Sequence, residues 1–142
     1  MTKTTLADII SGGPVHKTMP DESVQTACMI LSAANVGALP VVDLNGELVG
    51  MLSERDVIRR CVILNRPPDI TKVRQVMTTH PQWLPPEATH EEAIAVMGKG
   101  RFRHLPICEN GKLVGIVSLR DFQPAQKARE SKSRDGTRLA AS

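Results

Sequence analysis

Aromatic side chains are almost absent from this sequence of 142 residues, which contains Trp83, Phe102 and Phe122 and no tyrosine. Proteins that bind single-stranded nucleic acid stack successive bases on aromatic rings, so this function is disfavoured. The charge balance is no better suited to duplex binding. Of 18 Lys and Arg and 15 Asp and Glu, five basic and two acidic residues follow Pro124, which leaves 13 of each sign before it. A neutral body lacks the broad basic surface of a duplex-binding domain.

Long apolar runs and paired cysteines are also missing. No stretch approaches the roughly 20 apolar residues of a membrane span, and the polar start MTKTTLADII lacks the apolar core of a signal peptide. We therefore expect no membrane span and a cytoplasmic location. Cys28, Cys61 and Cys108 are odd in number and have no C-x-x-C spacing. Neither a disulfide framework nor a metal site is predicted.

Catalytic motifs are the third absence. The sequence contains no P-loop, no G-x-G-x-x-G after a strand, no G-x-S-x-G and no H-E-x-x-H. The four histidines lie in different predicted elements: His16, His80, His90 and His104. We predict a protein that is not an enzyme, with no catalytic residue and no catalytic cofactor.

What the chain does contain is an internal repeat. The stretch GMLSERD, residues 50–56, returns as GIVSLRD, residues 115–121, and the two are preceded by matching NGELV and NGKLV. Further upstream the offset grows by one residue, which falls in a turn at Leu44. Half a chain of this length buries too little surface to be comfortably stable, so we expect the two halves to share one core.

Each repeat is predicted to follow the same order of elements. A short extended piece precedes an apolar-periodic helix, from Val24 in the first repeat and from Thr89 in the second. A hairpin around an Asn-Gly turn follows, and S-x-x-D then begins another helix. Short lead-in helices are expected at residues 6–11 and 70–77. The predicted divisions are repeat 1 over 6–65, repeat 2 over 70–125, and a polar basic tail over 126–142 that we expect to be disordered.

The S-x-x-D boxes admit two interpretations. Ser at a helix N-cap with an acid three residues later forms a capping box, which stabilises a helix without any ligand. The same atoms suit a nucleotide. Free N–H groups at a helix start and a Ser hydroxyl can hold phosphate, and an ionised Asp can accept both hydroxyls of a ribose. The chemistry of the box does not choose between a cap and a site.

The ordered set GALPVVD, NGELVGMLSERD, RHLPICE and NGKLVGIVSLRD resembles a tandem pair of cystathionine β-synthase (CBS) domains. The resemblance covers nearly all of residues 6–125. It implies an α/β (α+β) fold in which two β-α-β-β-α repeats pack with pseudo-twofold symmetry into one module. It also implies adenine nucleotides or related adenosyl ligands in clefts between the repeats.

The resemblance further implies roles for particular residues. Asp56 and Asp121 are the candidates for the ribose hydroxyls, with Ser53 and Ser118 at the phosphate or ribose end. Arg103 and His104 occupy a place where related modules hold phosphate, whereas the first repeat has Gly37-Ala38 there. We therefore expect a better-equipped site of Asp56 with Arg103, His104, Ser118 and Arg120, and a weaker one of Asp121, Ser53 and Arg55. Side chains and backbone around three further residues are expected to hold adenine: Thr18, Leu39 and Leu105.

The leading hypothesis is a regulatory module that binds AMP, ADP, ATP or NAD(H) and acts through its homodimer geometry or a separate partner protein. The alternative is a ligand-independent structural module for dimerisation, in which the boxes only cap helices. The candidate dimer faces are the helix carrying Val57, Ile58 and Cys61 and the helix at Phe122. Nucleic-acid binding through the basic tail is a weaker third hypothesis.

Overall fold

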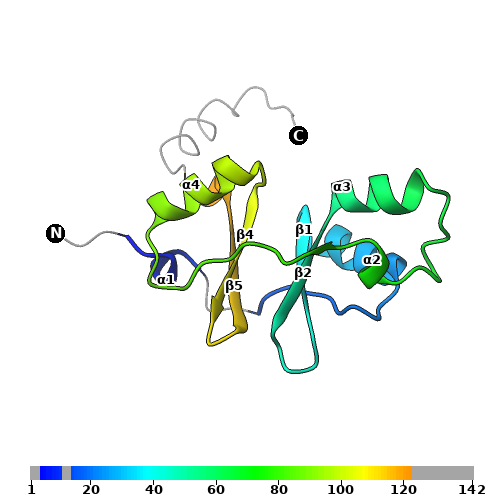
Figure 1. Cartoon of the computed structure of the whole chain (residues 1–142), viewed down its shortest axis with the longest axis horizontal. Coiled ribbons are helices and arrows are strands. Elements are labelled where there is room, and N and C mark those ends of the chain that lie inside the picture. The colour runs from blue at the N-terminus through cyan, green and yellow to red at the C-terminus, as the bar shows by residue number, and fades with distance from the viewer. Residues whose placement is uncertain (1–3, 11–13, 123–142) are drawn as a thin grey trace.

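The computed structural model describes residues 4–10 and 14–122. Two β-hairpins lie side by side in the middle of the molecule, and helices cover their outer sides (Figure 1). None of the helices in this part of the chain is both long and apolar enough to cross a bilayer. The predicted tail over 126–142 lies outside the described residues.

The two hairpins have the same construction. Strand β1 (Ala38–Val42) pairs antiparallel with β2 (Leu48–Ser53), and β4 (His104–Glu109) pairs with β5 (Lys112–Ser118). Each register shifts by one residue near the turn, between Val41 and Val42 and between Ile107 and Cys108. The turn glycines Gly46 and Gly111 have φ angles of 83° and 82°, as left-handed turn positions require. The recurrence in sequence is therefore a recurrence in backbone geometry.

Each hairpin packs against a helix that starts with a hydroxyl cap. Helix α2 (Val24–Ala34) begins after Ser23, whose Oγ accepts the N–H of Thr26, and α4 (His90–Gly100) begins after Thr89, whose Oγ1 accepts the N–H of Glu92. Both end on a left-handed residue, Asn35 or Arg101. The extended pieces before the helices are short parallel bridges, Thr18 to Val41 and Leu84 to Ile107. The predicted β-α-β-β order is confirmed in both repeats.

The lead-in segments cross between the repeats. Helix α1 (Leu6–Ile9) belongs to the first repeat in sequence, yet the Leu6 N–H donates to the Ala88 carbonyl at 2.8 Å. The 3₁₀ turn η2 (Val73–Gln75) precedes the second repeat, yet the Val73 N–H donates to the Glu22 carbonyl at 2.8 Å. Strand β3 (Thr78–Thr79) continues this crossing by pairing with β2. Each repeat is thus completed by the lead-in of the other.

The hydrophobic core is divided in two, so the expectation of one shared core is wrong. One cluster holds residues of α2, β1 and β2 together with Val73 and Val76, and the other holds residues of α4, β4 and β5 together with Leu6. The physical reason is the layer order, because each hairpin buries one face against its own helices. The exchanged lead-ins contribute to both clusters and hold the halves together.

The helix after the first S-x-x-D box is less regular than predicted. After Ser53 comes α3 (Glu54–Val57), which widens into a π-helical segment, η1 (Ile58–Val62), where the Ile63 N–H donates to the Ile58 carbonyl at 2.9 Å. After Ser118 the structure describes only a 3₁₀ turn, η3 (Leu119–Phe122). Cys61 is fully buried, whereas Ile58 is half exposed. Widened turns of this kind recur at functional sites.

Candidate functional site

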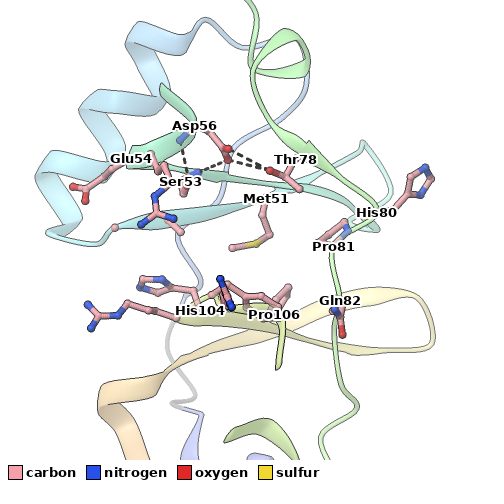
Figure 2. Close-up of a pocket in the computed structure, with 17 residues that line it drawn as sticks. Met51, Ser53, Glu54, Asp56, Thr78, His80, Pro81, Gln82, His104 and Pro106 are labelled. Atoms are coloured by element: carbon pink, nitrogen blue, oxygen red, sulfur yellow. Dashed lines mark hydrogen bonds between the residues drawn. The ribbon is translucent and has the colours of Figure 1, made fainter. Parts of the chain in front are cut away.

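A pocket of about 620 Å³ lies between the two repeats. One wall is the end of β2 and the start of α3, and the facing wall is the start of β4 with the loop before it. Figure 2 shows Ser53, Asp56 and Thr78 on one side and His104 and Pro106 on the other. The linker after β3 closes a third side. The volume lies in the range of small-molecule and cofactor sites.

The first S-x-x-D box forms one edge of this pocket. The Asp56 N–H donates to Ser53 Oγ and the Ser53 N–H donates to Asp56 Oδ2, each at 3.1 Å. The predicted capping box is therefore present. A further donor comes from the linker, because Thr78 Oγ1 lies 3.3 Å from both Asp56 carboxylate oxygens (Figure 2). Asp56 is only half-buried, so its carboxylate retains acceptor capacity toward the pocket.

Three arginines reach the pocket from both repeats. Arg55 lies in the first turn of α3, and Arg101 and Arg103 lie between α4 and β4. Among the described residues none of the three is in a salt bridge, whereas Arg74 elsewhere pairs with Asp21. Guanidinium groups without a carboxylate partner are suited to bind phosphate. Glu54, at the same rim, carries the opposite charge.

His104 faces Gly37 across the pocket. A Cβ on Gly37 would lie 3.5 Å from His104 Cε1 and 3.5 Å from Glu54 Oε1, so both side chains lie at ordinary van der Waals distance from this position. Burial lowers the pKa of His104 from 6.5, and the nearby Arg103 guanidinium lowers it further. The Asp121 and Glu54 carboxylates oppose this shift. A neutral imidazole at this position can become protonated when a bound anion adds negative charge.

The second S-x-x-D box is not part of this pocket. Its Ser118 N–H donates to Asp121 Oδ2 at 2.8 Å, which is the capping contact. The lining does not include Ser118, Arg120 or Asp121. The grouping of residues therefore differs from the expected one, since Asp56 meets Arg103 and His104 together with its own neighbours Ser53 and Arg55. The reason is local, because those neighbours sit on the same helix turn as Asp56.

The three residues expected around adenine do not line this pocket. Leu39 and Leu105 are fully buried in the two core clusters, and Thr18 is 2% exposed and donates to Glu22. Side chains alternate across a strand, so when Leu39 and Leu105 face the helices, Ala38 and Pro106 face the pocket. The apolar lining therefore comes from the strand positions next to the expected ones.

Several pocket residues were missed by the sequence reasoning. The contribution from the linker and the α4–β4 loop is the largest: Thr78, His80, Pro81, Gln82, Arg101 and Phe102. The linker reaches the pocket by pairing with β2, and no repeat pattern or motif signals that contact. Glu54 and Met51 could have been found, since they adjoin the box. In the described part of the chain, no group of three or more His, Cys, Asp or Glu could hold a metal ion.

A family model for the CBS domain matches the chain twice, over residues 6–63 and 73–126. The CBS domain-containing protein YhcV of Bacillus subtilis is 38% identical over 112 residues, which cover 79% of this chain and 79% of that protein. YlbB of Bacillus subtilis is 33% identical over 128 residues, covering 89% of this chain and 85% of that protein.

Solved structures have the same arrangement. The CBS-domain containing protein ATU1752 from Agrobacterium tumefaciens is 31% identical with a TM-score of 0.77, covering 87% of this chain and 99% of that one. The structure of CBSX2 in complex with AMP is 27% identical with a TM-score of 0.74, covering 89% and 98%. The resemblance noted in the sequence is confirmed, and the chain belongs to the CBS domain family, with the domain present twice.

Proposed function

We propose that this chain is a regulatory module, not an enzyme, that binds an adenine nucleotide in the pocket between its repeats. The observation that carries the proposal is the pocket itself, which combines the Ser53–Asp56 box with the loop of Arg101, Arg103 and His104. Within the described residues, none of these three side chains is in a salt bridge. A structural relative has been solved with AMP. The candidate ligands are AMP, ADP, ATP and NAD(H).

Each part of the nucleotide has a chemical counterpart in the pocket. The Asp56 carboxylate accepts the ribose hydroxyls, because it is acceptor-only when ionised and is held by two donors on the protein side. The phosphate lies toward Arg55, Arg103 and His104. Apolar surface for the base comes from Met51, Ala38 and Pro106. The linker residues contribute backbone groups next to that surface.

A thermal-shift and calorimetric titration tests the proposal. A ligand that binds only the native state stabilises it by about 2.7 kcal/mol at a hundredfold excess over Kd. We expect stabilisation by at least one of AMP, ADP, ATP or NAD(H), and none by the same concentrations of cytidine nucleotides. If no adenine nucleotide stabilises the protein, the proposed ligand class is wrong and the capping interpretation of both boxes remains.

The exposed end of the helix after Asp56 supports a homodimer. Four large apolar side chains on consecutive turns are 53–66% exposed: Ile58, Val62, Ile63 and Leu64. A contiguous apolar patch on a small protein usually marks an interaction site. The patch begins two residues after Asp56, so a ligand at the box and a partner at the patch contact one short helical segment. We therefore place the dimer interface at this patch.

Light scattering with size-exclusion chromatography tests the interface. Val62→Glu should convert a dimer into a monomer, because it introduces a charge into the apolar contact. Met29→Glu is the control, since Met29 is also exposed, at 63%, but lies on another helix, α2, and is not one of the four patch residues. A monomeric wild type, or equal behaviour of the two variants, would rule out this interface. A dimer that persists with no response to any nucleotide would favour the alternative, a ligand-independent structural module.

A further inference from the structure

Arg60 reaches from the π-helical segment to the linker that closes the pocket. Its Nη1 donates to the Met77 carbonyl at 2.9 Å and to the Val76 carbonyl at 3.2 Å. Arg60 does not line the pocket. These are charge-assisted hydrogen bonds to backbone, which are stronger than neutral ones. They hold the chain immediately before Thr78.

The same face of the helix makes a second hydrogen-bonded contact with the linker, through Asp56. Asp56 and Arg60 are four residues apart, a spacing that places side chains on one side of a helix. Asp56 accepts the Thr78 hydroxyl, while Arg60 donates to the preceding carbonyl of Met77. These contacts form a closed circuit. Hydrogen bonds join Asp56 to Thr78 and Arg60 to Met77, and the backbone connects Thr78 to Met77 and Arg60 to Asp56.

The linker needs such support because its strand is short. β3 contains only Thr78 and Thr79, which pair with Met51 and Gly50. The next residue, His80, has a φ of 52°, a left-handed conformation that is uncommon for a residue with a Cβ. A strand of two residues followed by a strained residue gains little stability from its own ladder. Its position therefore depends on contacts at its start.

We propose that Arg60 is a positioning residue for the nucleotide pocket. By holding the Val76 and Met77 carbonyls, it keeps Thr78 against Asp56 and keeps the linker wall in place. The Ser53 N–H and the Thr78 hydroxyl then fix the orientation of the Asp56 carboxylate and the lone pairs it presents to a ribose. The effect on ligand affinity rests on the proposed function, whereas the effect on the linker does not.

Amide hydrogen exchange on the ligand-free protein tests the circuit directly. Arg60→Ala should speed exchange of the amides of residues 76–79 by at least about tenfold, the loss expected for one charge-assisted hydrogen bond. Arg60→Lys should restore part of the protection, since an ammonium still reaches one carbonyl. Arg59→Ala is the matched control, because Arg59 is the adjacent exposed arginine and makes no hydrogen bond or salt bridge within the described residues. Equal exchange in wild type and Arg60→Ala would overturn the proposal.

AMP titrations then test the consequence for the pocket. Arg60→Ala should weaken AMP binding by about tenfold and Arg59→Ala by less than about twofold. Thr78→Val should weaken it too, and the double variant should lose less than the product of the two effects, because both act on one carboxylate. Additive losses, or unchanged affinity despite faster exchange, would overturn the positioning role. If wild type binds no adenine nucleotide, the proposed function and the positioning role fail together, while faster exchange in Arg60→Ala would still establish the circuit.

Discussion

The two S-x-x-D boxes share the contact from the serine N–H to the aspartate carboxylate, but their surroundings differ. Among the described residues, only the first box also has the return contact from the aspartate N–H to the serine hydroxyl. The Ser53–Asp56 box borders a pocket of about 620 Å³, where it meets Thr78 from the linker and the Arg101–His104 loop from the other repeat. The Ser118–Asp121 box makes its capping contact and lies outside that pocket. Opposite the first box the chain carries Arg103 and His104, whereas their counterparts in the first repeat are Gly37 and Ala38. A duplicated motif has therefore acquired unequal chemistry through residues outside the motif.

The sharpest test of this difference is the aspartate itself. Asp56→Ala should weaken AMP binding by about a hundredfold, because two hydrogen bonds to a charged acceptor are lost. Asp121→Ala should change the affinity by less than about threefold. Isothermal titration measures both affinities. Each variant should also lose about 1 kcal/mol of unfolding free energy, since each removes a capping acid, so the stability change serves as an internal control. Equal losses of affinity would show that both boxes bind.

Alanine substitutions at the glycines that begin the two motifs, Gly50 and Gly115, should lower the stability to a similar extent. These glycines serve the packing of the fold, which both repeats share, and not the pocket, which borders one box. A Cβ on Gly50 would lie 2.7 Å from Met77 Sδ and 3.0 Å from the Thr78 carbonyl oxygen. On Gly115 it would lie 2.9 Å from Ile10 Cγ2. Both glycines thus admit the lead-in of the other repeat. Gly50→Ala and Gly115→Ala should each lower the unfolding free energy by about 1–3 kcal/mol in urea titrations.

A third glycine provides the control for that experiment. A Cβ on Gly98, within α4, meets no atom within 4 Å. Gly98→Ala should therefore raise stability by up to about 1 kcal/mol, the helix-propensity gain of alanine. Tolerance of alanine at Gly50 would contradict the close crossing of the linker over β2.

Arginines in the two repeats should differ in how much they contribute to the affinity for a ligand that carries a phosphate. Arg103→Ala should weaken AMP binding by about tenfold, and the difference from wild type should shrink as salt screens the charges. Arg120→Ala is the matched control, since Arg120 is exposed and outside the pocket lining. It should change the affinity by less than about twofold. Titrations at low and high ionic strength measure both, and adenosine should be insensitive to Arg103→Ala. An equal loss for adenosine would show that Arg103 does not contact phosphate.

The smallest expected effect is a pH dependence of the AMP affinity. Only the pocket at the first box should show it, because that pocket contains His104. In the free protein the pKa of His104 lies below 6.5, chiefly because of burial, so the imidazole is neutral at pH 7. A bound phosphate raises that pKa, so binding takes up a proton and AMP affinity increases as the pH falls toward 6. A rise of one unit gives at most about tenfold.

Calorimetry in buffers of different ionisation enthalpy measures this proton uptake, and His104→Gln should abolish it. Lowering the pH should have the opposite effect on the stability of the ligand-free protein, which should decrease. Its unfolded state binds the His104 proton more readily than the folded state, so stability falls as the pH drops below 6.5 and through the lowered folded pKa. Persistent proton uptake in His104→Gln would assign it to another group.

Much of this molecule could be predicted locally. The repeat, the Asn-Gly hairpins, the hydroxyl caps and both S-x-x-D boxes depend on contacts within a few residues, and the structure contains all of them. The widening of the helix at Ile58–Val62 was not predicted, because its pattern of apolar residues is that of an ordinary helix. The strand residues that line the pocket are one position away from the predicted Leu39 and Leu105, since strand alternation decides which neighbour faces the pocket.

The sequence by itself determined that two similar units exist and that Asp56, Arg103 and His104 are candidates for one site. Only the tertiary structure decided that the lead-ins cross, so that Leu6 completes the second core cluster and Val73 the first. The same crossing brings Thr78 to Asp56 across 22 residues of chain and Arg60 to Met77 across 17. The physical reason is that these contacts satisfy backbone carbonyls and a carboxylate far apart in sequence, where no periodicity or spacing can signal them.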